Sequence, residues 1–124
     1  MLDAYSRFNA GERTPELWYF HKDAEYHTSS ADPDSAVHRG IDAIRTQFQS
    51  WTTTYPDLTV EPLEAKEYGD RVFLWVRFAG HGAGSGVPID MELAHVVTLE
   101  HGRARRVAEY MGRADGLRAA GLPE

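Results

Sequence analysis

The longest helical pattern in the chain follows Gly40. Ile41, Ile44, Phe48 and Trp51 recur there at spacings of three and four residues, so they share one face of a helix. The residues between them are mainly polar and would face solvent. The pattern therefore predicts the main helix of the fold, with one apolar face available to cover a sheet.

Two shorter helices are expected before it. Residues 2–9 carry two aromatic side chains three positions apart, and Gly11 is a plausible stop. Thr14 and Pro15 have the residue types of an N-cap and a first helical position. A first strand then follows at residues 24–30, where the helical spacing gives way to alternation.

The second half of the chain has the alternation and residue types of β-strands. Four runs separated by turn residues are expected to form an antiparallel meander, at residues 58–68, 71–81, 89–100 and 103–111. Residues 114–122 would close the chain as a short helix or turn. Helices followed by such strands indicate an α+β fold, in which a strongly bent mixed or antiparallel sheet encloses a pocket.

The pairing of the last two strands decides which side chains face this pocket. We expect a three-residue loop at residues 100–102. In that register His95 lies opposite Val107, and Leu93 lies opposite Glu109. These four side chains would share the face toward the pocket, and a loop of different length would change the register.

The strand at residues 71–81 is apolar on both faces. We assign the face with Phe73, Trp75 and Arg77 to the pocket, because a buried arginine needs an acidic partner and Glu109 is the best candidate. A strand with two apolar faces needs two covers, and in a short chain the second would be another subunit. We therefore predict a homodimer through the outer sheet face.

Composition narrows the classes of function. The 124 residues fit one domain spanning residues 1–124. The chain has no cysteine, which excludes disulfides, thiolate nucleophiles and cysteine-bound metal. Thirteen Lys and Arg residues against nineteen Asp and Glu residues give a formal charge of −6, which would repel a phosphate backbone. We expect no nucleic-acid partner.

No segment predicts secretion or membrane insertion. The N-terminal residues lack an apolar run preceded by positive charge. No stretch approaches the roughly 18 apolar residues that a membrane span needs. We expect a cytoplasmic protein with no membrane partner.

Several segments resemble the SnoaL-like branch of the nuclear-transport-factor-2-like superfamily, which includes polyketide cyclases, ketosteroid isomerases and limonene-epoxide hydrolases. The resemblance covers essentially the whole chain. It implies a cone-shaped α+β domain around a pocket for a small, largely apolar molecule. Its carriers are residues 21–28, 37–40, 69–72, 82–87, 102–103, 109–110 and 119–122, with Ala43, Ile44 and Trp51 on the main helix.

The resemblance does not identify which of the family's reactions this chain would catalyse. His95 is similar in position to the oxyanion-hole acid of ketosteroid isomerases, Thr28 lies near their catalytic aspartate, and Tyr5 lies near their oxyanion tyrosine. Glu109 resembles the last-strand aspartate of limonene-epoxide hydrolases, whereas Arg77 takes roughly the place of another acid. Because these acids are replaced, the resemblance implies the fold and the pocket only.

We expect a cofactor-independent isomerase, cyclase or hydrolase that acts on a small polyketide-, terpene- or steroid-like molecule by acid–base chemistry. His95 would transfer a proton, since imidazole titrates near neutral pH. Arg77 with Glu109 would polarise an oxygen or activate water. The alternative is a non-catalytic ligand-binding or dimerisation module, in which Arg77 and Glu109 are an internal ion pair and His95 is a core residue.

Other motifs add no cofactor or metal. His27, His38 and His81 lack the spacing of a histidine metal site, so we expect no metal. The glycine-rich residues 82–86 lack the spacing of a phosphate-binding loop or a nucleophile elbow. The candidate ligand-binding side chains are Thr28, Phe20, Phe48, Trp51, Phe73, Trp75, Leu93 and Val107.

Overall fold

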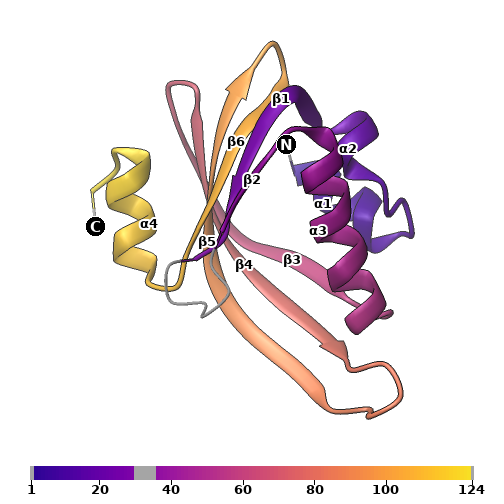
Figure 1. Cartoon of the computed structure of the whole chain (residues 1–124). Helices are drawn as coiled ribbons and strands as arrows, with labels where there is room; N and C mark the ends of the chain where they lie inside the picture. The colour runs from indigo at the N-terminus through magenta and orange to yellow at the C-terminus, as the bar shows by residue number, and fades with distance from the viewer. Residues whose placement is uncertain (1, 30–35, 124) are drawn as a thin grey trace.

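Three N-terminal helices lie on one side of a strongly bent sheet, and a C-terminal helix lies on the other (Figure 1). The computed structural model describes residues 2–29 and 36–123. The helices are α1 (Leu2–Asn9), α2 (Pro15–Trp18), α3 (Ile41–Thr54) and α4 (Arg113–Ala120). The strands are β1 (Phe20–His27), β2 (Val37–Arg39), β3 (Thr59–Tyr68), β4 (Arg71–His81), β5 (Pro88–Glu100) and β6 (Arg103–Tyr110).

The six strands form one sheet in the order β2-β1-β6-β5-β4-β3. The last four are the predicted antiparallel meander, and β1 joins it in parallel to β6. The α+β class with a bent mixed sheet is therefore confirmed. β1 begins at Phe20 and ends at His27, earlier than the predicted strand, whose last predicted residue lies outside the described residues. β2 was not predicted, because three residues are too few to show alternation.

The turn between β5 and β6 is one residue shorter than expected. Glu100 pairs directly with Arg103, so only His101 and Gly102 form the turn. Both have positive φ angles, 51° and 77°, as the commonest two-residue hairpin turns require. A bulge follows, and it leaves Arg105 without a partner on β5.

The turn and the bulge together shift the register by two residues. His95 lies opposite Glu109, and Val97 lies opposite Val107. The predicted pairs of His95 with Val107 and of Leu93 with Glu109 are therefore wrong. Because a shift of two residues keeps every side chain on its face, the predicted grouping on one face survives.

The assignment of the two faces of β4 is wrong. Leu74 pairs with His95 and Val76 with Leu93, so the other face of β4, with Phe73, Trp75 and Arg77, points away from the pocket. Both faces are apolar, and the inward face was chosen because Glu109, on a distant strand in the sequence, was expected to pair with Arg77. Its partner is Asp90 on the neighbouring strand β5, at 2.8 and 2.6 Å.

The second apolar face is covered in part by the chain itself. Phe73, Ala94 and Val96 are buried in a cluster with Leu117 and Ala120 of α4. In this part of the face, α4 provides the cover that we expected from a second subunit. None of the described helices is long and apolar enough to cross a membrane.

Replacing Gly116 with alanine tests how closely α4 packs on the sheet. Helix propensity alone would make Gly116→Ala stabilising by about 1 kcal/mol. A Cβ at Gly116, however, would lie 2.5 Å from Ala94 Cβ and 3.0 Å from Phe73 Cε2. We expect a net loss of about 1–3 kcal/mol in the free energy of unfolding, measured in urea.

The added variant Ala94→Gly removes the closest of these clashes. It should reduce the destabilisation when combined with Gly116→Ala. A Gly116→Ala protein more stable than the wild type would contradict the close packing of α4.

Candidate functional site

An apolar cavity lies between the N-terminal helices and the inner face of the sheet. Its volume is about 50 Å³, which is room for roughly three to five water-sized groups. Most of its lining is aromatic, and no Asp, Glu, Lys or Arg is among the described residues that line it. The aromatic lining residues are Tyr5, Phe8, Trp18, Tyr19, Phe20, Tyr26, Phe48, Trp51 and Phe78.

Helix α1 covers this cavity and is fixed to the edge strand β3. Tyr5 and Phe8 are one helical turn apart, so both face inward and are buried. Asn9 holds the end of the helix in place, because its amide Nδ2 donates to Val60 O at 2.9 Å and its Oδ1 accepts from Val60 N at 2.8 Å. The short helix thus gains a tertiary anchor beside Tyr5.

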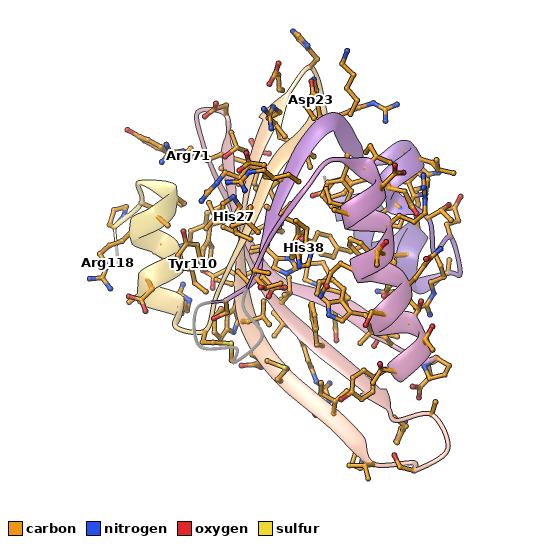
Figure 2. The ribbon with its side chains drawn as sticks, viewed as in Figure 1. Asp23, His27, His38, Arg71, Tyr110 and Arg118 are labelled. Atoms are coloured by element: carbon orange, nitrogen blue, oxygen red, sulfur yellow. The ribbon has the colours of Figure 1, made fainter. Side chains whose placement is uncertain are left out.

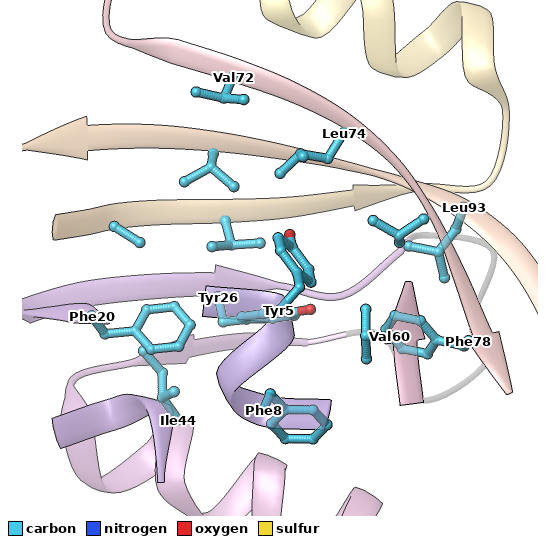
Figure 3. Close-up of a cluster of buried hydrophobic side chains, with 14 of the residues drawn as sticks. Tyr5, Phe8, Phe20, Tyr26, Ile44, Val60, Val72, Leu74, Phe78 and Leu93 are labelled. Carbon is cyan, nitrogen blue, oxygen red and sulfur yellow. The ribbon is translucent and has the colours of Figure 1, made fainter. Parts of the chain in front are cut away.

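Rings from α3, β1 and β4 form the opposite walls. Figure 3 shows Tyr26 of β1 and Phe78 of β4 beside Tyr5. Trp51 lies 5.5 Å from Tyr26, 5.1 Å from Phe48 and 6.2 Å from Phe78 between ring centroids. The ring planes meet at 70° to 76°, close to an edge-to-face arrangement. The predicted lining residues Phe20, Phe48, Trp51, His95 and Val107 all border this cavity.

A chain of hydrogen bonds lies at the inner end of the cavity. The Tyr5 hydroxyl is 3.0 Å from His95 Nδ1, and the Tyr26 hydroxyl is 3.3 Å from His95 Nε2. Tyr26 also donates to Glu109 Oε2 at 2.7 Å. The side chains of His95 and Glu109 are only 6% and 8% exposed. The structure therefore brings together two predicted site residues, His95 and Glu109, through a tyrosine that was not predicted.

The bond from Tyr26 to Glu109 sets the direction of the other protons when the imidazole of His95 is neutral. Tyr26 donates its proton to Glu109, so the Tyr26 oxygen accepts from His95 Nε2–H. His95 Nδ1 is then an acceptor, and Tyr5 donates to it. Tyr5 also shares a hydrogen bond with Tyr19. The side chains of Tyr5, His95, Tyr26 and Glu109 thus form a continuous relay that ends at the carboxylate.

Burial keeps the tyrosines of the relay protonated. It raises the pKa of Tyr5 and of Tyr26 well above the ordinary phenol value, because a phenolate would lose its hydration. The negative charge of Glu109 raises the pKa of Tyr26 further. Burial raises the pKa of Tyr19 as well. Each hydroxyl is therefore available as a hydrogen-bond donor at neutral pH.

Five of the predicted site residues lie elsewhere. Phe73, Trp75 and Arg77 are on the opposite face of the sheet, as the register of β4 requires. Thr28 follows the end of β1, and its Oγ1 bonds to the backbone of Ala36 instead of facing the cavity. Leu93 is on the inner face and buried, but it belongs to the core and does not line the cavity.

Tyr5, Tyr19 and Tyr26 were not predicted as site residues. One signal for Tyr26 was present, because residues two apart on a strand share a face and Thr28 had been chosen as inward. β1 ends at His27, so Tyr26 is the residue that occupies the inward position. Tyr5 had been noted only for its place relative to a family tyrosine.

A second hollow, of about 280 Å³, borders Glu109 from the other side. His27, Arg106 and Tyr110 contribute to its lining. Figure 2 shows His27 and Tyr110 on the side of the sheet that carries α4. Glu109 thus lines this second hollow and is connected to the aromatic cavity through Tyr26. Among residues 2–29 and 36–123, no group of three or more His, Asp or Glu side chains is placed to hold a metal.

The buried tyrosines predict a loss of stability in alkali. The folded chain keeps protons that the unfolded chain releases above about pH 10, so their contribution is complete below that pH and is lost as pH rises. Each buried phenol can lower the free energy of unfolding by up to about 1.4 kcal/mol per pH unit. Urea titrations between about pH 9 and pH 11.5 would measure this slope.

Tyr5→Phe and Tyr26→Phe should each make the alkaline slope smaller. Tyr68→Phe, which removes a phenol that is 59% exposed, is the matched control. Identical slopes in the wild type and in both core variants would contradict the raised pKa values.

The comparisons with known proteins agree on one fold. A search of curated protein sequences gives no match. Among solved structures, a hypothetical protein of ketosteroid isomerase-like fold from Catenulispora acidiphila DSM 44928, in complex with trimethylamine, is 20% identical with a TM-score of 0.74. The match covers 98% of this chain and 92% of that chain.

Two further structures have the same fold. A candidate SnoaL-like polyketide cyclase from Jannaschia sp. CCS1 is 18% identical, with a TM-score of 0.72, and the match covers 98% of this chain and 92% of that one. TerC, co-crystallised with polyporic acid, is 18% identical, with a TM-score of 0.74 and coverage of 95% and 92%. At these identities the likeness establishes the fold. The profile of the SnoaL-like domain, in turn, matches residues 2–107, and the chain therefore belongs to the SnoaL-like domain family.

Proposed function

We propose that the chain binds a small, largely apolar molecule in the aromatic cavity and removes a proton from it through Tyr5. This would be the first step of a cofactor-independent isomerisation, cyclisation or hydrolysis. The observation that carries the proposal is the continuous relay from Tyr5, which lines the cavity, through His95 and Tyr26 to the buried carboxylate of Glu109.

The proton balance of this step is simple. A ligand proton passes to the Tyr5 oxygen while the proton of Tyr5 moves to His95 Nδ1. The proton on Nε2 moves to the Tyr26 oxygen, and the proton of Tyr26 moves to Glu109 Oε2. The ligand loses one proton, Glu109 becomes a carboxylic acid, and the reverse sequence can return the proton to another atom of the ligand. Positioned proton transfer of this kind contributes about 10²–10⁴-fold to a rate.

The solved relatives support a small-molecule ligand. One of them holds trimethylamine and another was crystallised with polyporic acid, so the fold accepts molecules of different size and charge. The cavity of about 50 Å³ favours a compact ligand here. A steroid nucleus, which the family resemblance also suggests, would require α1 and α2 to move away from the sheet.

Exchange of carbon-bound hydrogen tests the proposal without knowledge of the substrate. Nitroethane is a compact carbon acid, and base-catalysed exchange of its α-protons in D₂O can be followed by proton NMR. We expect the wild type to accelerate this exchange over buffer. Tyr5→Phe and Glu109→Gln should each reduce the acceleration by about 10²-fold, because each interrupts the relay.

Tyr68→Phe is the matched control, since it removes an exposed hydroxyl outside the cavity. It should exchange at the wild-type rate. Equal acceleration by the wild type and by a folded Glu109→Gln variant would contradict proton transfer to Glu109.

A second candidate function is non-catalytic ligand binding. One observation favours it: both ring nitrogens of His95 already have protein partners, as a structural histidine in a core requires. In that case nitroethane or a similar compact molecule would bind without exchange, and Tyr5→Phe would change affinity only.

A homodimer through the outer sheet face is also a proposal. Trp75 and Arg77 lie on this face beside the part covered by α4. Light scattering coupled to size-exclusion chromatography at micromolar concentration should give the dimer mass. A monomer mass would contradict the proposal.

A further inference from the structure

We propose that residues 13–18, which include α2, form a lid that opens to admit ligands larger than the closed aromatic cavity. This inference rests on the proposed function, because it takes the cavity to be a ligand site, and it adds the route by which the ligand enters. Three features carry it: the place of the lid at the cavity, the unpaired polar atoms buried in the lid, and the weak local structure that holds it closed.

The lid forms one wall of the aromatic cavity. Pro15 and Trp18 both line the cavity, whose volume is about 50 Å³. Pockets that hold ligands with several rings have volumes of roughly 300–1,000 Å³. The closed cavity therefore fits a compact molecule, and a larger apolar ligand requires one wall to move.

The lid buries polar side-chain atoms that have no hydrogen-bond partner. They are Arg13 Nη1, Glu16 Oε2 and Trp18 Nε1, and within the part of the chain that the structure describes they are the only ones. Glu16 as a whole is only 5% exposed. A buried polar atom without a partner regains its hydration when its segment opens, so each one favours the open state by roughly tenfold.

The secondary structure of the lid is weak. α2 has four residues, about one turn, and a helix this short is not stable without tertiary contacts. The side chain of Thr14 makes no cap hydrogen bond, and Pro15 has no N–H to donate. Leu17 is 64% exposed and adds little apolar burial. Its carbonyl accepts from Arg103 at 3.5 Å, which is long for a hydrogen bond.

Two arginines contact rings at the lid without fixing it firmly. The Arg7 guanidinium lies 3.9 Å from the ring centroid of Trp18, but its side chain is 40% exposed, and cation–π contacts are weak where solvent reaches them. The Arg13 guanidinium lies 4.5 Å from the ring centroid of Phe8, and the unpaired Nη1 atom offsets that contact. Opening breaks both contacts and leaves the sheet intact.

The chain on either side of the lid is fixed. Before it, Asn9 holds α1 on Val60 of β3 through two hydrogen bonds. After it, Tyr19 O accepts from Ala104 N of β6 at 3.0 Å. Gly11 lies between α1 and the lid with a φ angle of 108°, and glycine can change its backbone angles at little cost. The lid can therefore open about Gly11 and Tyr19 while α1 stays in place.

Amide hydrogen exchange in the native state measures the opening. Leu17 N and Tyr19 N donate to Thr14 O and Pro15 O within the lid, so both amides are released when it opens. In the wild type they should exchange at least tenfold faster than amides of β4 and β5, which require global unfolding. Glu16→Met removes the buried carboxylate and keeps the length of the side chain. It should slow exchange of both amides about tenfold, because the closed state then loses an unpaired charge.

Binding of 2-naphthol tests whether the opening serves the cavity. This apolar molecule has two fused rings and is too large for the closed cavity, so it requires the open state. The affinity of such a ligand falls by the same factor as the open population. Glu16→Met should therefore weaken 2-naphthol binding about tenfold in a fluorescence titration, and leave binding of the compact nitroethane unchanged.

Glu67→Met is the matched control, because it replaces an exposed carboxylate on β3, outside the lid. It should exchange and bind as the wild type does. Glu16→Leu provides a second test if Glu16→Met does not fold.

The outcomes separate this inference from the proposed function. Exchange of Leu17 and Tyr19 only through global unfolding would overturn the lid, and so would faster exchange in a folded Glu16 variant. Slower exchange with unchanged 2-naphthol affinity would overturn the lid as the route of entry. Binding of neither 2-naphthol nor nitroethane to the wild type would contradict the proposed function, and the entry route with it, whereas the exchange rates decide the opening separately.

Discussion

The core of this protein depends on how an imidazole and a carboxylate are kept satisfied inside an aromatic interior. His95 and Glu109 face each other across β5 and β6, both almost fully buried. Polar groups buried without partners would cost several kcal/mol. Tyr5 and Tyr26 supply these partners from a helix and a strand distant in sequence. The position of α1 over the sheet follows from that requirement.

Much of the fold could be predicted from the sequence because its elements have clear periodicity. The apolar spacing after Gly40 gave α3, and alternation between turn residues gave the meander. The faces of β4 could not be assigned in the same way, since both are apolar and a pattern of period two does not say which one is inward. The choice of Glu109 as the partner of Arg77 led to the wrong inward face of β4. The actual partner, Asp90, lies on the adjacent strand.

Only part of the candidate site could be predicted from the sequence, for a different reason. Histidine and glutamate attract attention as titratable residues, and their shared face was predicted despite the wrong pairs. Tyr5 and Tyr26 were hidden because tyrosine also serves as an ordinary core residue, and only the hydroxyl contacts distinguish the two roles. Thr28 was chosen in place of Tyr26 because the end of a strand is not marked by alternation.

The pairing of Asn9 with Val60 has a consequence for the chain in a crowded solution. β3 is an outer strand of the sheet, and such edges can recruit strands of other molecules and start aggregation. The Asn9 amide occupies both the N–H and the C=O of Val60, as a neighbouring strand would. Farther along, Glu61, Glu64, Lys66 and Glu67 place charges on the same edge. Asn9 thus anchors α1 and also blocks part of the β3 edge, which could otherwise pair with a strand of another molecule.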